Sequence, residues 1–319
     1  MNECILKINN LTLDFEIKEK YYRALDNINL TFKRGKTHAL VGESGCGKTM
    51  TAMSVLKLLP NNAKIISGEI FYNDKNLLDF DDKQMQEIRG QKIALIPQDP
   101  MTSLNPLYTI ENQLIESITL NNKISKNKAK ELAYDALKEV DIKNIDNVLK
   151  SYPHELSGGM KQRIIIAMAL LTDAEIIIAD EPTTALDVTI QAQILNLLDK
   201  IKKQNKTIIL ITHNLGIVSE YCDDVCIMYS GKIVEQSETK ELFKNPKHPY
   251  TKALINAIPK EKNKKLENIK GQPKTITEKI SGCYFNPRCN KAFDKCKVKN
   301  PELVNVNNNS KVACLLYLE

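Results

Sequence analysis

The sequence lacks any apolar run that approaches the roughly 18 to 20 residues needed to cross a bilayer. Residues 1–4 also lack the basic segment leading into an apolar one that begins an export signal. We therefore expect a chain that neither spans a membrane nor is exported. Apolar residues make up 42% of its 319 residues and charged residues 26%, which excludes a wholly disordered chain and allows a sizeable core.

The lysine-rich segment at residues 244–279 contains no arginine, and Tyr250 is its one aromatic residue. Nucleic-acid sites interleave aromatic residues or arginines with their lysines. The net charge of +6 is a modest excess for a chain of this length. We therefore expect a solvated, partly extended linker in this segment and no nucleic acid among the partners.

Apolar strand-like runs alternate with helical patterns from residue 1 to about 240, as in an α/β domain with a largely parallel sheet. Three runs are continuously apolar, which is typical of strands buried on both faces: residues 37–41, 175–179 and 207–212. Helical periodicity covers residues 127–140, 160–171 and 190–202. We predict an α/β domain at residues 1–240 and a C-terminal extension at residues 241–319.

The pattern G-x-x-x-x-G-K-[ST] follows the first of these strands and precedes a helix-compatible run. Its glycines let backbone N–H groups turn toward phosphate oxygens, and the next helix adds the positive end of its dipole. Lys48 is expected to reach the β and γ phosphates, and Thr49 to bind Mg²⁺ through its hydroxyl. The predicted nucleotide-binding residues are Gly42, Ser44, Gly45, Cys46, Gly47, Lys48 and Thr49.

Cys46 lies inside this loop, close to Lys48 and to a helix N-terminus. Such surroundings are expected to lower the pKa of a thiol. Two interpretations follow: Cys46 is a reactive thiolate, or it is an inert small residue.

Two carboxylates, Asp180 and Glu181, end the second apolar run. A nucleotide loop of this type needs a carboxylate at the end of a neighbouring strand. We expect Asp180 to bind Mg²⁺ directly or through water, and Glu181 to polarise the attacking water.

A second set of small residues lies upstream of that strand, at Leu156, Ser157, Gly158 and Gly159. Small residues at the start of a helix expose N–H groups and a hydroxyl, which makes a further anion site. Two phosphate-binding helix starts in one chain suggest that the second serves a nucleotide held by another subunit.

With these motifs in this order, residues 4 to about 233 resemble the ATP-binding subunit of an ABC transporter. Leu156 to Gly159 match its signature motif, although Met160 stands where most members carry Gln. The resemblance implies a P-loop ABC-type fold, with a mixed sheet core and a helical subdomain at about residues 99–170. It also implies ATP and Mg²⁺ as cofactors.

The same resemblance implies roles for further residues. Gln98 matches the loop glutamine that senses Mg²⁺ and water and faces the membrane subunit. Asp187 matches the loop that crosses the ATPase dimer interface, and His213 matches the switch histidine at the γ-phosphate. An aromatic residue near the N-terminus usually stacks on adenine, which points to Tyr22 or its neighbour Tyr21.

Residues 97–106, 152–160 and 182–191 closely resemble dipeptide and oligopeptide importers and, of their two ATPases, the "D" subunit. This implies ATP hydrolysis that energises import of di- and oligopeptides, by a peripheral protein at the cytoplasmic face of the membrane. It also implies a head-to-tail heterodimer with a second ATPase subunit, two transmembrane permease subunits and, indirectly, an extracytoplasmic solute-binding protein.

Two alternatives remain open. One is a related importer for nickel or another small solute, since the ATPase does not touch the cargo. The other is a soluble ABC ATPase of translation or DNA repair. Such proteins typically carry two cassettes or long coiled-coil insertions, and this sequence shows neither.

Four of the eight cysteines lie in the C-terminal extension, at Cys283, Cys289, Cys296 and Cys314. They lack C-x-x-C pairs, so their spacing leaves open a [4Fe–4S] cluster, Zn²⁺, reduced thiols or a disulfide. Residues 282–289 resemble the G-C-x-F-x-P-R-C pattern of peptide-importer ATPases, some of which bind an iron–sulfur cluster there. The resemblance implies a [4Fe–4S] cluster, which would hold together a tail too small for a core of its own.

Overall fold

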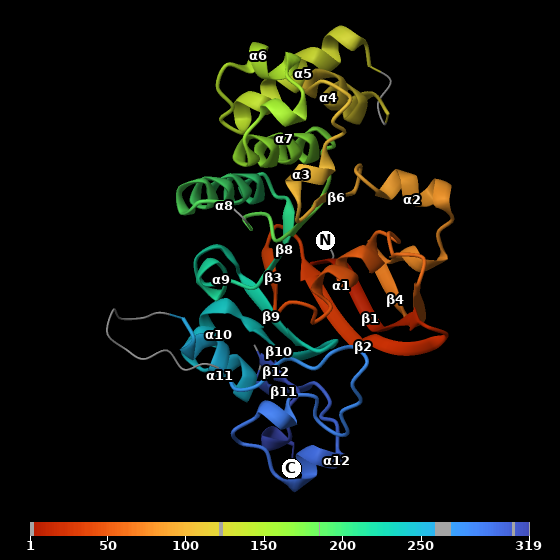
Figure 1. The fold of residues 1–319 in the computed structure, drawn as a ribbon, viewed down its shortest axis with the longest axis vertical. Helices are drawn as coiled ribbons and strands as arrows, with labels where there is room; N and C mark the ends of the chain where they lie inside the picture. The colour runs from red at the N-terminus through yellow and green to blue at the C-terminus, as the bar shows by residue number, and fades with distance from the viewer. Residues whose placement is uncertain (1–2, 121–123, 185, 259–268, 308–309, 319) are drawn as a thin grey trace. The chain divides into compact units, whose positions relative to one another are not determined.

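The computed structural model describes residues 3–120, 124–184, 186–258, 269–307 and 310–318 (Figure 1). The chain divides into two compact units. The first unit combines Met1–Asp79 with Leu210–Glu319, and the second is Phe80–Ile209.

The N-terminal part of the first unit is a four-stranded antiparallel sheet in the order β2-β1-β4-β5. Its strands are β1 (Cys4–Ile17), β2 (Lys20–Lys33), β4 (Ala63–Tyr72) and β5 (Lys75–Asn76). The red and orange ribbons of Figure 1 show the long β1 and β2 lying side by side.

A second set of strands in the first unit runs in the order β11-β12-β10-β9-β3. The pairing of β3 with β9 is parallel, and the other pairings in this set are antiparallel. The strands are β3 (Thr37–Val41), β9 (Asp224–Tyr229), β10 (Lys232–Glu238), β11 (Val304–Asn307) and β12 (Ser310–Val312). The unit's helices are α1 (Lys48–Val55), α9 (Leu215–Tyr221), α10 (Thr239–Lys244), α11 (Pro249–Asn256) and α12 (Asp294–Val298), with short 3₁₀ turns at Leu77–Asp79, Asn286–Arg288 and Leu315–Tyr317.

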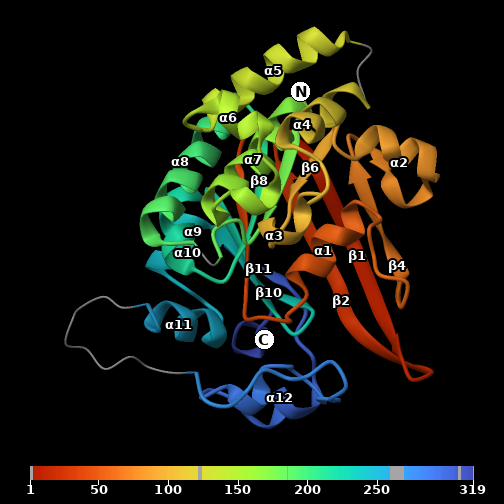
Figure 2. The same ribbon diagram turned by 45° about the horizontal axis from the view of Figure 1, so that its top comes forward.

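The second unit contains a parallel strand pair and most of the helices. The pair is β6 (Ile93–Ile96) and β7 (Ile176–Asp180), and β8 (Thr207–Thr212) crosses the boundary into the first unit. The helices are α2 (Asp82–Ile88), α3 (Pro100–Ser103), α4 (Ile110–Thr119), α5 (Lys126–Glu139), α6 (Ile145–Lys150), α7 (Gly158–Leu171) and α8 (Val188–Lys203), with a 3₁₀ turn at Pro153–Glu155. Figure 2 shows α4, α5, α6 and α7 gathered into one bundle.

The three buried strands and three helices expected from the sequence are present as β3, β7, β8, α5, α7 and α8. Every residue of the three strands is buried, because both of their faces are covered. The predicted domain boundary near residue 240 and the helical subdomain at about residues 99–170 stay predictions. No helix in the described ranges combines the length and apolar character needed to cross a membrane.

The expected solvated linker at residues 244–279 is wrong for Pro249–Asn256, which forms helix α11. The ring of His248 accepts a hydrogen bond from the Tyr250 N–H at 3.0 Å, and Pro249 occupies the first turn, so the sequence starts a helix here. Tyr250 and Ile255 are buried, and the free energy gained by burying them offsets the conformational entropy lost when the segment becomes ordered. Residues 269–279 have no regular secondary structure and are mostly exposed, and residues 259–268 lie outside the described part.

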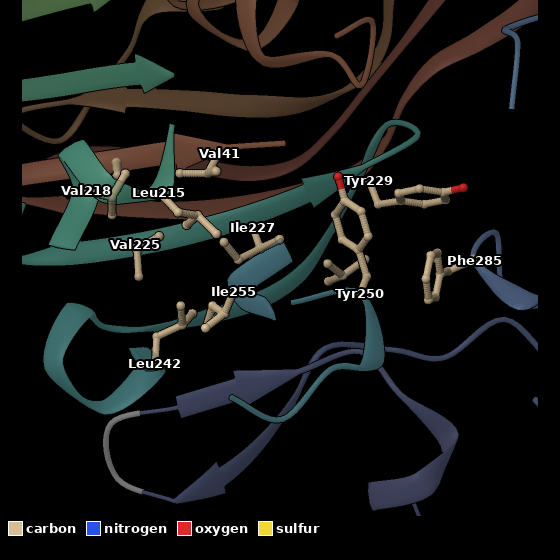
Figure 3. Packing of buried hydrophobic residues seen from close by; sticks show 12 residues of the cluster. Val41, Leu215, Val218, Val225, Ile227, Tyr229, Leu242, Tyr250, Ile255 and Phe285 are labelled. Atoms are coloured by element: carbon tan, nitrogen blue, oxygen red, sulfur yellow. The ribbon is translucent and has the colours of Figure 1, made fainter. Parts of the chain in front are cut away.

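The C-terminal extension shares a core with the strands of the first unit (Figure 3). Phe285 packs against Tyr229 of β9 and Tyr250 of α11, with ring centroids 5.1 and 5.2 Å apart. The two tyrosine rings are themselves 4.8 Å apart. The extension is therefore held by aromatic packing onto the sheet, and not by a core of its own.

Candidate nucleotide-binding site

The predicted phosphate-binding loop connects the buried strand β3 to helix α1. Gly45 and Gly47 have φ angles of 76° and 107°, a left-handed conformation that side chains with a Cβ rarely adopt. A Cβ at Gly47 would lie 2.7 Å from Leu25, and one at Gly42 would lie 2.2 Å from the Met228 carbonyl oxygen. Backbone conformation thus requires Gly45, close packing requires Gly42, and both require Gly47.

Lys48 begins α1 and folds back over the loop. Its ammonium group donates to the carbonyl oxygens of Gly42 and Glu43 at 2.8 and 3.1 Å, and the residue is 5% exposed. Ser44 and Gly45 are exposed at the tip of the loop, and Thr49 is half-buried in the first turn of α1. The arrangement places a buried positive charge against the loop, whose exposed tip is open to an anion.

Cys46 does not have the lowered pKa that its place in the loop predicts. Burial raises the pKa of its thiol, and this outweighs the opposing effect of Lys48, whose ammonium nitrogen lies 3.9 Å from the sulfur. The side chain is buried, so reagents in solvent have little access to it. The structure therefore favours the inert interpretation of Cys46.

In the second unit, the parallel pair β6 and β7 brings Gln98 and Glu181 together. The Gln98 amide donates to the Glu181 carboxylate at 3.3 Å, and the Thr184 hydroxyl donates to the same oxygen at 3.0 Å. Glu181 has a φ of 44°, a left-handed backbone that turns its side chain out of the strand direction. Asp180, the last residue of β7, is buried.

The signature residues begin helix α7, and Asp187 begins helix α8. The Ser157 hydroxyl accepts from the Met160 N–H at 3.3 Å, and the Asp187 carboxylate accepts from the Ile190 N–H at 2.9 Å. The predicted helix start at Ser157 is confirmed, and Ser157 itself is exposed. Both side chains cap helices, which accounts locally for the residue types found there.

His213 and the two candidate tyrosines lie in the first unit. His213 is exposed at the end of β8, directly before Asn214, whose side chain caps α9. Tyr22 is half-buried on β2, and Tyr21 is 62% exposed beside it. The choice of Tyr22 for stacking on adenine stays a prediction.

The four cysteines of the C-terminal extension line one small cavity of about 10 Å³, together with His248 and Phe285. Burial raises the pKa of Cys283 to about 11, and the neighbouring thiols of Cys314, Cys296 and Cys289 add to the rise. All four thiols are free. Within the described ranges, no three His, Cys, Asp or Glu side chains form a group arranged to hold a metal ion.

Two residues near the loop were missed by the sequence analysis, Tyr250 and Arg288. The Arg288 guanidinium pairs with the Glu43 carboxylate through contacts of 2.6 and 3.0 Å, and the Glu43 N–H donates to the Tyr250 hydroxyl at 3.1 Å. The sequence separations are 245 and 207 residues, so no local pattern points to either contact.

Comparisons with known proteins agree with these motifs. Residues 25–184 match a family model described as ABC transporter, and residues 234–296 match one described as oligopeptide/dipeptide transporter, C-terminal region. A probable peptide ABC transporter ATP-binding protein of Sinorhizobium fredii is 44% identical over 98% of this chain and 95% of its own length. The oligopeptide transport ATP-binding protein AppD of Bacillus subtilis is 43% identical over 99% of this chain and 97% of its own length.

Among solved structures, the ATP-binding cassette MJ0796 bound to ADP and phosphate is 27% identical, with a TM-score of 0.67. The matched region covers 74% of this chain and 99% of the chain in that structure. The predicted fold class, a mixed sheet core with helices, is confirmed by this likeness.

Proposed function

The chain belongs to the ABC transporter family and is an ATP-hydrolysing subunit of that family, and from this premise we propose that it energises the import of peptides. The observation that carries the proposal is the match of residues 234–296 to the C-terminal region of oligopeptide and dipeptide transporters. This region lies outside the part that the general ABC transporter model matches, and the model that it matches is described for oligopeptide and dipeptide transporters.

For ATP binding, we propose that the loop N–H groups and Lys48 contact the phosphates and that Tyr22 stacks on adenine. Mg²⁺, when bound, would neutralise charge on the β and γ phosphates. Thr49, Gln98 and Asp180 fit such an ion by chemistry, because hydroxyl, amide and carboxylate oxygens are the protein ligands that Mg²⁺ prefers.

For hydrolysis, we propose that Glu181 accepts a hydrogen bond from the attacking water. The water oxygen forms a bond to the γ-phosphorus, and the bond from that phosphorus to the bridging oxygen of ADP breaks. His213 donates to the γ-phosphate oxygens, where negative charge must be stabilised. The hydrogen bond from Gln98 to Glu181 supports this role, since it orients the carboxylate before water arrives.

We propose a head-to-tail heterodimer with a second ATPase subunit. The signature residues of one chain, with Asp187 beside them, would then cap the nucleotide held by the loop of the other. The exposed Ser157 at the start of α7 supports this, because a helix start attracts anions. The pair would sit on two transmembrane permease subunits at the cytoplasmic face, and an extracytoplasmic solute-binding protein would deliver the peptide.

The variant Glu181→Gln tests this function. In the assembled transporter it should still bind ATP with Mg²⁺ and hold the ATPase dimer closed, while phosphate release and peptide uptake fall by about two orders of magnitude or more. Glu116→Gln, on the exposed face of α4, is the matched control and should act as the unchanged protein does. Near-normal hydrolysis in Glu181→Gln would contradict the proposed role, and uptake of nickel in place of peptides would contradict the proposed cargo.

We also propose that Cys283, Cys289, Cys296 and Cys314 bind a [4Fe–4S] cluster. The support is chemical: four thiols line a single small cavity, and thiolates are the ligands of such clusters. Protein purified without oxygen should carry about four irons per chain, and Cys289→Ser should lose them. Cys222→Ser, a cysteine outside this cavity, is the control. Zinc, or no metal at all, in the unchanged protein would refute the cluster.

A further inference from the structure

Glu43 of the phosphate-binding loop is held at three groups, its N–H, its carbonyl oxygen and its carboxylate. Its N–H donates to the Tyr250 hydroxyl at 3.1 Å, and its carbonyl oxygen accepts from the Lys48 ammonium at 3.1 Å. Its carboxylate receives both terminal nitrogens of Arg288 at 2.6 and 3.0 Å. Two of these three anchors come from the C-terminal part of the chain.

The Arg288 side chain is 5% exposed and that of Glu43 is 25% exposed, so their ion pair is not a surface pair. Arg288 makes two further contacts: it donates to the Tyr229 hydroxyl at 3.4 Å and to the Lys270 carbonyl oxygen at 3.0 Å. Bidentate pairing between guanidinium and carboxylate is stronger and more directional than a single contact. These contacts fix the direction in which the Glu43 carboxylate points.

The charge of Glu43 is unfavourable for a loop that binds phosphates. A carboxylate in such a loop repels an anionic ligand, and the repulsion grows where solvent is partly excluded. Arg288 offsets this charge and holds the carboxylate toward the C-terminal segment. Without Arg288, an unneutralised carboxylate would remain beside the phosphates.

We propose that Arg288 is a positioning residue for ATP binding, which neutralises Glu43 and holds its carboxylate away from the phosphates. The proposal goes beyond the function above, and it rests on the proposed role of residues 42–49 in binding ATP. Arg288 acts only through Glu43 and contacts no reacting atom.

The same segment joins the loop to the cysteine cavity. Arg288 ends the 3₁₀ turn that precedes Cys289, and Phe285 both lines the cavity and packs on the Tyr250 ring. Figure 3 shows Tyr229, Tyr250 and Phe285 gathered together at one end of the core. A displacement of this segment would therefore move Arg288 and disturb the packing of Tyr250, two of the three groups that hold Glu43.

The test is equilibrium binding of a fluorescent ATP analogue with Mg²⁺ to the full chain. Arg288→Ala should raise the dissociation constant about tenfold, as expected for loss of a charge-assisted pair beside an anion. The double variant Arg288→Ala with Glu43→Gln should return to within about threefold of the value measured for Glu43→Gln alone. The control Lys297→Ala removes an exposed ion pair with Asp294 in the same segment and should have no effect.

The double variant separates positioning from general stability, because a merely structural Arg288 would not be rescued by removing the charge of Glu43. The weakening in Arg288→Ala should also shrink at high salt, since it is a charge repulsion. If Arg288→Ala does not fold, Arg288→Lys carries the test, with roughly threefold weaker binding because the charge stays and the bidentate contact is lost.

Normal affinity in the Arg288 variants, or a double variant as weak as Arg288→Ala, would overturn the proposal. Lys48→Ala in the same assay distinguishes failure of the positioning role from failure of the ATP site itself. If Lys48→Ala loses the analogue while Arg288→Ala keeps it, only the positioning role fails. If Lys48→Ala also binds normally, the loop is not the ATP site and both proposals fail.

Discussion

The phosphate-binding loop and the four-cysteine segment are built in opposite ways. In the loop, eight consecutive residues contain the left-handed glycines and the Lys48 that folds back on them. In the cysteine segment, the four thiols are spread over 32 residues, from Cys283 to Cys314, and line one cavity together with Pro249 of α11. The geometry of a local motif is therefore set by its own residues, whereas the geometry of a dispersed motif depends on packing in the core.

The largest loss of stability should come from Phe285→Ala, which removes the ring between the cysteine cavity and the sheet. Loss of a buried phenylalanine of this kind costs about 3 to 5 kcal/mol of unfolding free energy. Chemical denaturation would measure the loss, with the partly exposed Phe293→Ala as the matched control. An equally small loss in both variants would show that the segment does not depend on the shared core.

A smaller loss of stability should distinguish two glycines, one from each predicted anion site. Gly47→Ala must adopt a left-handed φ and meets Leu25 at 2.7 Å, so we expect a loss of about 1 to 2 kcal/mol or more in stability. Gly158→Ala meets nothing within 4 Å and should cost less than about 0.5 kcal/mol. Thermal denaturation of the two variants checks the difference. Equal costs would mean that the geometry of the loop is not set by its glycines.

The smallest effect should be that of substituting Cys46 on ATP hydrolysis. Because burial raises the pKa of this thiol, it stays protonated at neutral pH, and its alkylation should accelerate only above the ordinary thiol range of about 8.5. Cys46→Ser should keep ATP hydrolysis within about twofold, because serine is of similar size. Rapid alkylation at pH 7 that ATP slows would restore the reactive interpretation.

Predictions from the sequence were correct for features that depend on neighbouring residues. The buried strand before Gly42, the strand that ends in Asp180 and the helix start at Ser157 follow from apolar runs, glycines and caps. The linker prediction was wrong at residues 249–256, because it rested on lysine-rich composition, whereas Tyr250 and Ile255 are buried in the core. The sequence left two interpretations of Cys46 open and predicted a lowered thiol pKa, since a short motif does not reveal how deeply its thiol is buried.

The sequence by itself therefore determined the family, the order of the nucleotide motifs and the chemistry each can perform, because these depend on residues a few positions apart. Only the tertiary structure decided that Arg288 and Tyr250 hold Glu43, and that the four thiols share one cavity with Phe285. Contacts between residues more than 200 positions apart arise from packing of the whole core, whose free energy no single segment encodes.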